Sequence, residues 1–142
     1  MNSKSLQSLK LFLWGICAFH VAVGIGLNVS PAFPQTMAAY YGATVEWTPA
    51  FLYILKPLGA FMLVLGVLAA VAALKPLENV AIVYGFMLLF LLRALQRLIH
   101  QDELLDVFGI TAKHNFGNMV FFTAMAVGLF LLLRAARRAT PA

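Results

Sequence analysis

Four polar residues near the end of the third apolar segment are spaced to share one helical face: Arg93, Gln96, Arg97 and His100. The intervals i, i+3, i+4 and i+7 place their side chains in a single stripe. Arg93 lies about six residues inside the segment, hence roughly 9 Å below its end at 1.5 Å per residue. Ionisable groups at such depth in a membrane cost about 2.5–3.5 kcal/mol each and are candidates for function. This stripe could hold the polar headgroup of a membrane-soluble ligand.

Other apolar segments bring polar residues to a comparable depth. Lys56 enters the second segment, and His114 and Asn118 share one face of the fourth segment with Phe121 and Met125. The apolar part of a pocket would be lined by Phe86, Phe90 and Phe121. The candidate ligand-binding residues are therefore Arg93, Arg97, Lys56, Gln96, His100, His114, Asn118 and His20.

The charges at this end of the molecule also permit a purely structural interpretation. Four cations, Lys56, Arg93, Arg97 and Lys113, stand against four carboxylates, Glu46, Asp102, Glu103 and Asp106. They could form a closed ion-pair network that needs no anionic ligand, and long basic side chains can reach the headgroups from inside a span. The sequence leaves the structural and the ligand-binding interpretations open.

His20 lies near the middle of the first apolar segment. It could form a hydrogen bond across helices, or it could relay protons or contact a ligand. A transmembrane b-type haem needs histidines at matched depth on two helices. His100 and His114 lie near the outer surface, so we do not expect haem. Two outer histidines and the single cysteine, Cys17, are a weak metal-ligand set, and we predict no metal site.

Catalytic motifs are absent from the sequence. It has no glycine-rich phosphate loop, no nucleophile elbow and no HExxH pattern. No carboxylate falls inside an apolar segment, which argues against a carboxylate-driven proton or cation pump. We therefore predict no catalytic residues, and an enzymatic activity of this chain alone is not expected.

The elements that carry these residues follow from composition and the length of the apolar runs. Of 142 residues, 63% are hydrophobic and 11% charged, against roughly 45–50% and 25% in soluble domains. Four runs, at about 11–29, 49–74, 80–99 and 116–133, approach the ~20 residues that cross a bilayer as a helix. We predict an all-α, integral membrane four-helix bundle in a single transmembrane domain, residues 1–142.

Basic residues predict the orientation of this bundle. Six of them, Lys4, Lys10, Lys75, Arg134, Arg137 and Arg138, would lie on one side of the membrane. By the positive-inside rule, this side is cytoplasmic and holds both termini. Because these residues flank apolar runs without interleaved exposed aromatics, we expect no nucleic-acid partner. A cleaved signal peptide in place of the first span would leave the orientation of the other three spans unchanged.

Two shorter helical elements are expected outside the spans. The segment 30–48 should contain a short interfacial helix, with Pro34 in its first turn and Gly42 at its end. The segment 100–108 should continue the third span as a helix and end at Gly109. Small residues predict close helix packing, and they are Ala18, Ala22 and Gly26 in the first span and Gly66 and Ala70 in the second.

Two local patterns characterise the second and third spans: Leu55-Lys56-Pro57-Leu58-Gly59-Ala60 with Leu65-Gly66, and Leu92-Arg93-Ala94-Leu95-Gln96-Arg97-Leu98. With the order of one span, a proline break, a short amphipathic segment and three further spans, they resemble the small DoxX-like four-helix bacterial membrane proteins. Relatives tend to have a basic residue followed by glycine in the second span, where this chain has Lys56 followed by proline. The resemblance implies the fold and a bacterial inner membrane. For some members it implies a link to quinone-dependent oxidation or membrane oxidoreductase complexes.

The sequence thus predicts a small polytopic protein of the cell inner membrane that contacts membrane lipids. Its expected role is that of a non-catalytic accessory or assembly subunit, with a membrane-protein partner or a second copy of the chain. The alternative is a lipid- or quinone-binding protein that serves a redox partner, with its polar site in the outer half of the bundle.

Overall fold

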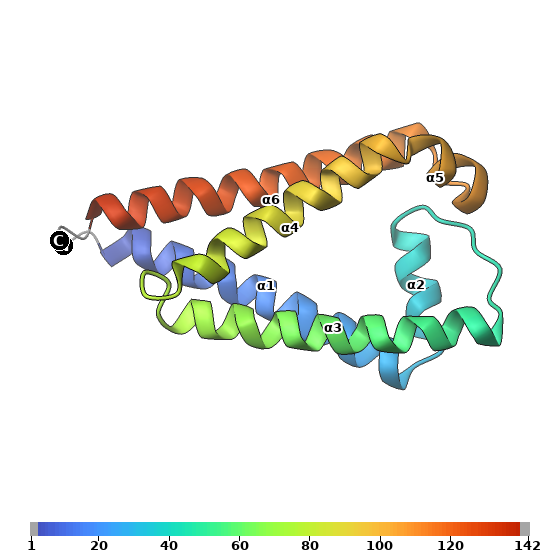
Figure 1. The fold of residues 1–142 in the computed structure, drawn as a ribbon, viewed down its shortest axis with the longest axis horizontal. Helices are drawn as coiled ribbons and strands as arrows, with labels where there is room; N and C mark the ends of the chain where they lie inside the picture. Colours follow the sequence, from blue (N-terminus) through green and yellow to red (C-terminus); the bar gives the residue numbers. More distant parts are fainter. Residues whose placement is uncertain (1–2, 140–142) are drawn as a thin grey trace.

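The computed structural model describes residues 3–139, and helices make up most of this range (Figure 1). The helices are α1 (Ser3–Val29), α2 (Ala32–Tyr40), α3 (Pro49–Leu74), α4 (Val80–Ile99), α5 (Gln101–Phe108) and α6 (Ala112–Ala139). Four of them are long and apolar enough to cross a membrane. These are α1, over Lys4–Val29, and the whole of α3, α4 and α6. The predicted all-α four-helix membrane bundle is confirmed.

The long helices form two pairs that diverge (Figure 1). α1 packs along α3 and α4 packs along α6, while α1 also contacts α6. The pairs meet at the end that holds the start of α1 and the end of α6, and they separate toward the end that holds α2 and α5. The bundle therefore has a closed end and an open end.

The apolar core occupies the closed end and the middle of the bundle. Its buried members on α1 and α3 are Leu9, Leu13, Ile16, Cys17, Ala69, Ala72 and Ala73. Those on α4 and α6 are Val83, Phe86, Met87, Phe90, Phe122, Ala126, Leu129, Leu133 and Ala136. Because the core stops short of the open end, the divergence there leaves room between the pairs.

Glycines bring α1 and α3 into close contact. A Cβ atom at Gly24 would lie 2.8 Å from the Gly59 carbonyl oxygen, and one at Gly66 would lie 2.6 Å from a methyl group of Val21. Such approach is the usual role of small residues between membrane helices. The predicted packing role of Gly66 is confirmed. Ala18 and Ala22, by contrast, are exposed on α1.

The shorter helices refine the predicted boundaries. The helix α2 lies within the expected segment, and Gly42 follows it with a positive φ of 72°. The segment after α4 is helical as expected, but it is a separate helix because the chain turns at His100. It ends at Gly109, whose φ is 62°. The fourth span is longer than predicted, because α6 begins at Ala112.

The open end is tied together across the two pairs. The backbone N–H of Thr44, after α2, donates a hydrogen bond to the carbonyl oxygen of Phe108, at the end of α5, over 2.7 Å. The ring of His114 on α6 lies against Gly42, where a Cβ atom would meet it at 2.8 Å. These contacts hold α2 and the loop that follows it against α5 and α6.

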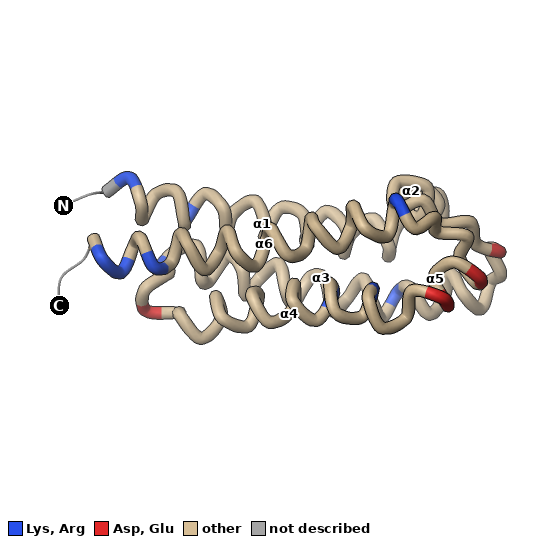
Figure 2. Tube along the Cα trace, turned by 90° about the horizontal axis from the view of Figure 1, so that it is seen from above, with Lys and Arg blue, Asp and Glu red and all other residues tan. Residues whose placement is uncertain are grey.

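The charges are distributed unevenly along the bundle. Figure 2 shows more of the Lys and Arg residues toward the closed end, although some lie in the half of the bundle near the open end, whereas most Asp and Glu lie at the open end. The positive-inside rule places the closed end in the cytoplasm. The orientation stays a prediction that labelling can test.

We expect a cysteine at Asp102 to react with a membrane-impermeant maleimide in intact cells, in a Cys17→Ser background. A cysteine at Glu78 should react only after permeabilisation. Both positions are exposed and lie at opposite ends of the bundle, so the two variants serve as mutual controls. The reverse labelling pattern would place both termini outside.

Candidate functional site

A cavity of about 1000 Å³ lies between the diverging helix pairs. Every helix contributes to its wall, and the lining is mainly apolar. From α1 come Phe12, Phe19 and Leu27, from α3 Leu58, Met62 and Leu65, and from α4 and α6 Leu89, Phe90, Phe121 and Met125. At the open end the lining includes Met37 of α2, Trp47 of the loop between α2 and α3, and Leu104 of α5. The expected apolar lining by Phe90 and Phe121 is confirmed, whereas Phe86 is buried in the core.

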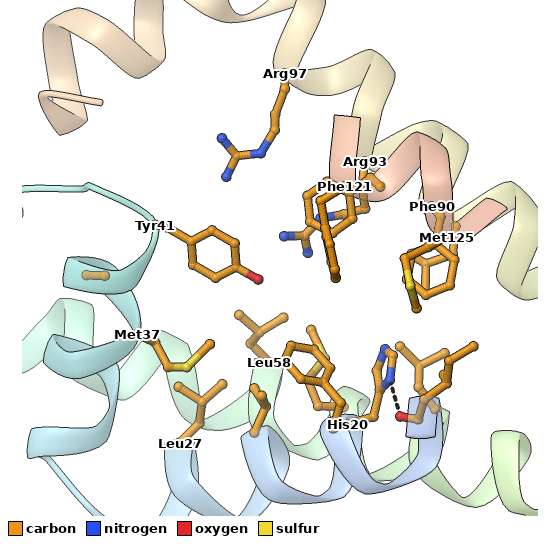
Figure 3. A pocket seen from close by; sticks show the side chains of 18 of the residues that line it. His20, Leu27, Met37, Tyr41, Leu58, Phe90, Arg93, Arg97, Phe121 and Met125 are labelled. Atoms are coloured by element: carbon orange, nitrogen blue, oxygen red, sulfur yellow. Dashed lines mark hydrogen bonds between the residues drawn. The ribbon is translucent and has the colours of Figure 1, made fainter. Parts of the chain in front are cut away.

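Arg93 and Arg97 are the charged residues among those that line the cavity. Both come from α4, and Figure 3 shows their guanidinium groups on the cavity side of the helix. The Arg93 guanidinium lies over the ring of Phe122, 4.9 Å from its centroid. Such cation–π contacts orient a guanidinium while leaving the N–H groups at its edge accessible.

Arg97 is held by a polar partner on α6. Its Nη1 donates a hydrogen bond to Asn115 Oδ1 over 3.1 Å, and Asn115 Nδ2 donates to the Arg97 carbonyl oxygen, also over 3.1 Å. Asn115 is only 2% exposed. Because α4 ends at Ile99, this carbonyl belongs to the last turn, where carbonyls have no N–H partner within their own helix. Asn115 therefore fixes both the backbone and the side chain of Arg97.

The predicted ion-pair network at the open end is not formed. Within residues 3–139 the ion pairs are Lys75–Glu78 at 2.9 Å and His100–Glu103 at 3.3 Å. In this range neither arginine of the cavity has a carboxylate partner, and the four carboxylates of this end are exposed on α5 and the loop before α3. The closed ion-pair network, one form of the structural interpretation, is therefore wrong for the described residues, and the cavity lining carries two cations and no carboxylate.

Tyr41 adds a third polar group near the arginines. Its ring centroid lies 5.6 Å from the Arg97 guanidinium carbon, and Figure 3 shows its hydroxyl group pointing into the cavity. This tyrosine is not among the candidate site residues predicted from the sequence. Its position follows from α2 lying across the open end, which no local pattern reveals.

His20 lines the cavity at greater depth and is only 4% exposed. Its Nδ1 lies 2.8 Å from the carbonyl oxygen of Ile16, one turn earlier on α1. A carbonyl oxygen only accepts, so Nδ1 carries the proton and Nε2 of the neutral ring is an acceptor. The predicted hydrogen bond across helices is wrong, since the bond lies within α1. The other ring nitrogen faces the cavity (Figure 3).

The other predicted site residues do not line the cavity. Lys56 and Gln96 are exposed, and Asn118 is half-buried on α6. His100 pairs with Glu103, and His114 contacts the Thr111 hydroxyl over 3.1 Å. The sequence groups these residues by their depth in the membrane. The face of the helix on which each residue lies decides whether its side chain reaches the cavity.

The His, Cys, Asp and Glu side chains of the described residues are not arranged to bind a metal ion. In the part of the chain that the structure describes, no three residues among His, Cys, Asp and Glu lie close enough to hold an ion. The chemistry of the cavity is therefore that of a large apolar volume with two oriented guanidinium groups, a phenol and an imidazole. No family model, curated protein or solved structure matches the chain, so this geometry alone supports the assignment.

Proposed function

We propose that this membrane protein binds a membrane-soluble amphiphile, a lipid or a quinone, inside the bundle. The observation that carries this proposal is the cavity of about 1000 Å³, apolar throughout most of its wall and polar near Arg93, Arg97 and Tyr41. Its volume lies at the upper end of the roughly 300–1,000 Å³ usual for ligand sites, which combine an apolar lining with few polar groups. An amphiphile matches both, because its hydrocarbon chain suits the apolar lining and its headgroup suits the polar residues.

Exposed lining residues support lateral entry from the membrane. Leu11, which lines the cavity, is 75% exposed on α1. Side chains of a closed chamber would not be exposed to this degree. Because α1 belongs to a candidate membrane span, a ligand dissolved in the bilayer would reach the cavity without crossing water.

The cellular role of this binding is part of the proposal. The resemblance to DoxX-like proteins favours a bacterial inner membrane and a quinone that serves a redox partner. An accessory or assembly subunit with a membrane-protein partner is the expectation from the absence of catalytic motifs. Both roles are compatible with an amphiphile in the cavity, which would then act for the partner or stabilise the assembly.

The test is a cavity-filling substitution with a matched control. Gly15 lines the cavity on α1, and a Cβ atom there would meet no atom within 4 Å. Gly15→Phe should therefore fill the cavity without disturbing the helices. Gly85 on α4 is equally open but does not line the cavity, so Gly85→Phe is the control.

We expect mass spectrometry of the protein, purified gently from its membrane, to find lipid or quinone bound to the wild type and to Gly85→Phe. In Gly15→Phe the bound amount should fall severalfold, because the ring occupies the space of the hydrocarbon chain. Equal amounts in all three proteins would contradict the proposal.

A further inference from the structure

We propose that the ligand is an acidic lipid, whose carboxylate or phosphate is held by Arg93 and Arg97 and whose hydrocarbon chain runs along α1. This inference rests on the proposed function, since it names the class of amphiphile in the same cavity. The shared chemistry is an anionic headgroup on an apolar chain.

The charged groups of the cavity lining are of one sign. Both charged lining residues are cations, and the carboxylates of the open end are exposed and do not line the cavity. Buried or half-buried charges without counter-ions are costly in an apolar environment. A ligand with an anionic headgroup supplies the missing counter-charge, whereas a neutral amphiphile leaves it uncompensated.

Both arginines keep hydrogen-bond donors available to a ligand. A guanidinium has five N–H donors in a planar fork that matches carboxylate and phosphate oxygens. Arg97 uses Nη1 for Asn115, and Arg93 makes no hydrogen bond to another residue in the described range 3–139. The rest of both forks, together with the Tyr41 hydroxyl group, faces the same region of the cavity (Figure 3).

His20 offers the cavity an acceptor and not a donor. Because Nδ1 donates to Ile16, the Nε2 atom of a neutral ring offers an acceptor, which does not bind an anion. His20 also lies on the far side of the cavity from Arg97, with Arg93 between them (Figure 3). The anionic group therefore belongs at the arginine end, and the region around His20 takes the chain.

The apolar wall of the cavity is long. On α1 the lining residues extend from Ser8 to Leu27, which spans about 28 Å at 1.5 Å per residue. This approaches the ~30 Å thickness of the hydrocarbon core of a bilayer. A wall of this length accommodates a long hydrocarbon chain, whereas a compact ring alone would leave most of it unfilled.

The experiment compares two ligands with the same chain, brominated palmitate and brominated hexadecanol, in phosphatidylcholine nanodiscs at alkaline pH. Binding is read from quenching of Trp47, which lines the cavity, in a Trp14→Phe protein that retains this single tryptophan. We expect palmitate to reach half-maximal quenching at a concentration at least about tenfold lower than hexadecanol, as charge-assisted hydrogen bonds imply. Lysophosphatidate without bromine, used as a competitor that relieves the quenching by brominated palmitate, shows whether a phosphate headgroup takes the same site as the carboxylate.

Substitutions assign the preference to the arginines. In Arg93→Gln/Arg97→Gln the advantage of palmitate should disappear while hexadecanol binding persists, and Lys113→Gln, which changes an exposed cation at the same end, should behave as wild type. Equal saturable quenching by both ligands in the wild type would overturn the acidic class but leave the proposed function intact. Quenching that neither saturates nor responds to Gly15→Phe would overturn both. Since the ligand comparison uses the wild-type residues of the cavity, it is decisive even if the double variant does not fold.

Discussion

Arg93→Met is expected to raise the thermal unfolding temperature of the ligand-free protein in detergent while it weakens acidic-lipid binding by about tenfold or more. The two effects have opposite signs because Arg93 has no carboxylate partner in the described part of the chain. Replacing a charge in an apolar environment with an apolar side chain of similar size removes a desolvation penalty, which in buried ion clusters amounts to about 1–4 kcal/mol. The cation–π contact with Phe122 that is lost is weaker, about 0.5–2 kcal/mol.

Differential scanning fluorimetry after delipidation measures the first effect, and Trp47 quenching by brominated palmitate measures the second. Lys113→Met is the control, because Lys113 is exposed and does not line the cavity. A fall in the unfolding temperature of Arg93→Met would mean that the arginine is held by partners that stabilise the empty protein. That result would support a structural role for the charged residues at the open end.

The four spans were predictable because a bilayer imposes a length and a composition on each crossing helix. The short helix α2 was also predictable, since Pro34 and Gly42 mark its beginning and end. The extra turns of α6 were not, because residues near the membrane surface such as His114 are polar and do not extend the apolar pattern. The turn at His100 was missed for a different reason. The residues after it are helix formers, so the sequence shows no break between α4 and α5.

The candidate site was predictable in depth but not in direction. Arg93 and Lys56 enter their spans to a similar depth, yet only Arg93 faces the cavity. Asn118 and Asn115 are three residues apart on α6, and the face that α6 presents to α4 makes Asn115 the partner of Arg97. Helical periodicity defines which residues share a face, but the contacts between helices decide which face points inward.

The divergence of the helix pairs has no counterpart in any local pattern. The glycine contacts hold α1 and α3 together within one pair, and the α2 segment lies at the open end, where the two pairs separate. The cavity therefore results from tertiary packing, while the residues that give it chemistry were visible as an unusual stripe of charge in an apolar segment. Sequence and structure thus contribute different parts of the same argument.

The second large effect is expected for Asn115→Ala, which should lower both the free energy of unfolding and the affinity for palmitate. Asn115 is buried and makes both a side-chain and a backbone hydrogen bond to Arg97. Its removal should lower the free energy of unfolding by about 1–2 kcal/mol. The freed Arg97 side chain should also lose its orientation, so palmitate binding should weaken by about tenfold while hexadecanol binding changes little. Scanning fluorimetry and Trp47 quenching report the two effects.

Asn115→Asp separates the position of Arg97 from its charge. The substitution keeps the size of the side chain and the acceptor 3.1 Å from Arg97 Nη1, but it introduces a carboxylate beside the guanidinium. If Asn115 acts only by holding Arg97 in place, palmitate should bind nearly as in the wild type. If the positive charge of the cavity recruits an acidic headgroup, the new carboxylate should neutralise Arg97 and weaken palmitate binding while leaving hexadecanol binding unchanged. We expect the second result, because the unpaired charge of the arginines is the property that distinguishes this cavity from an ordinary gap between membrane helices.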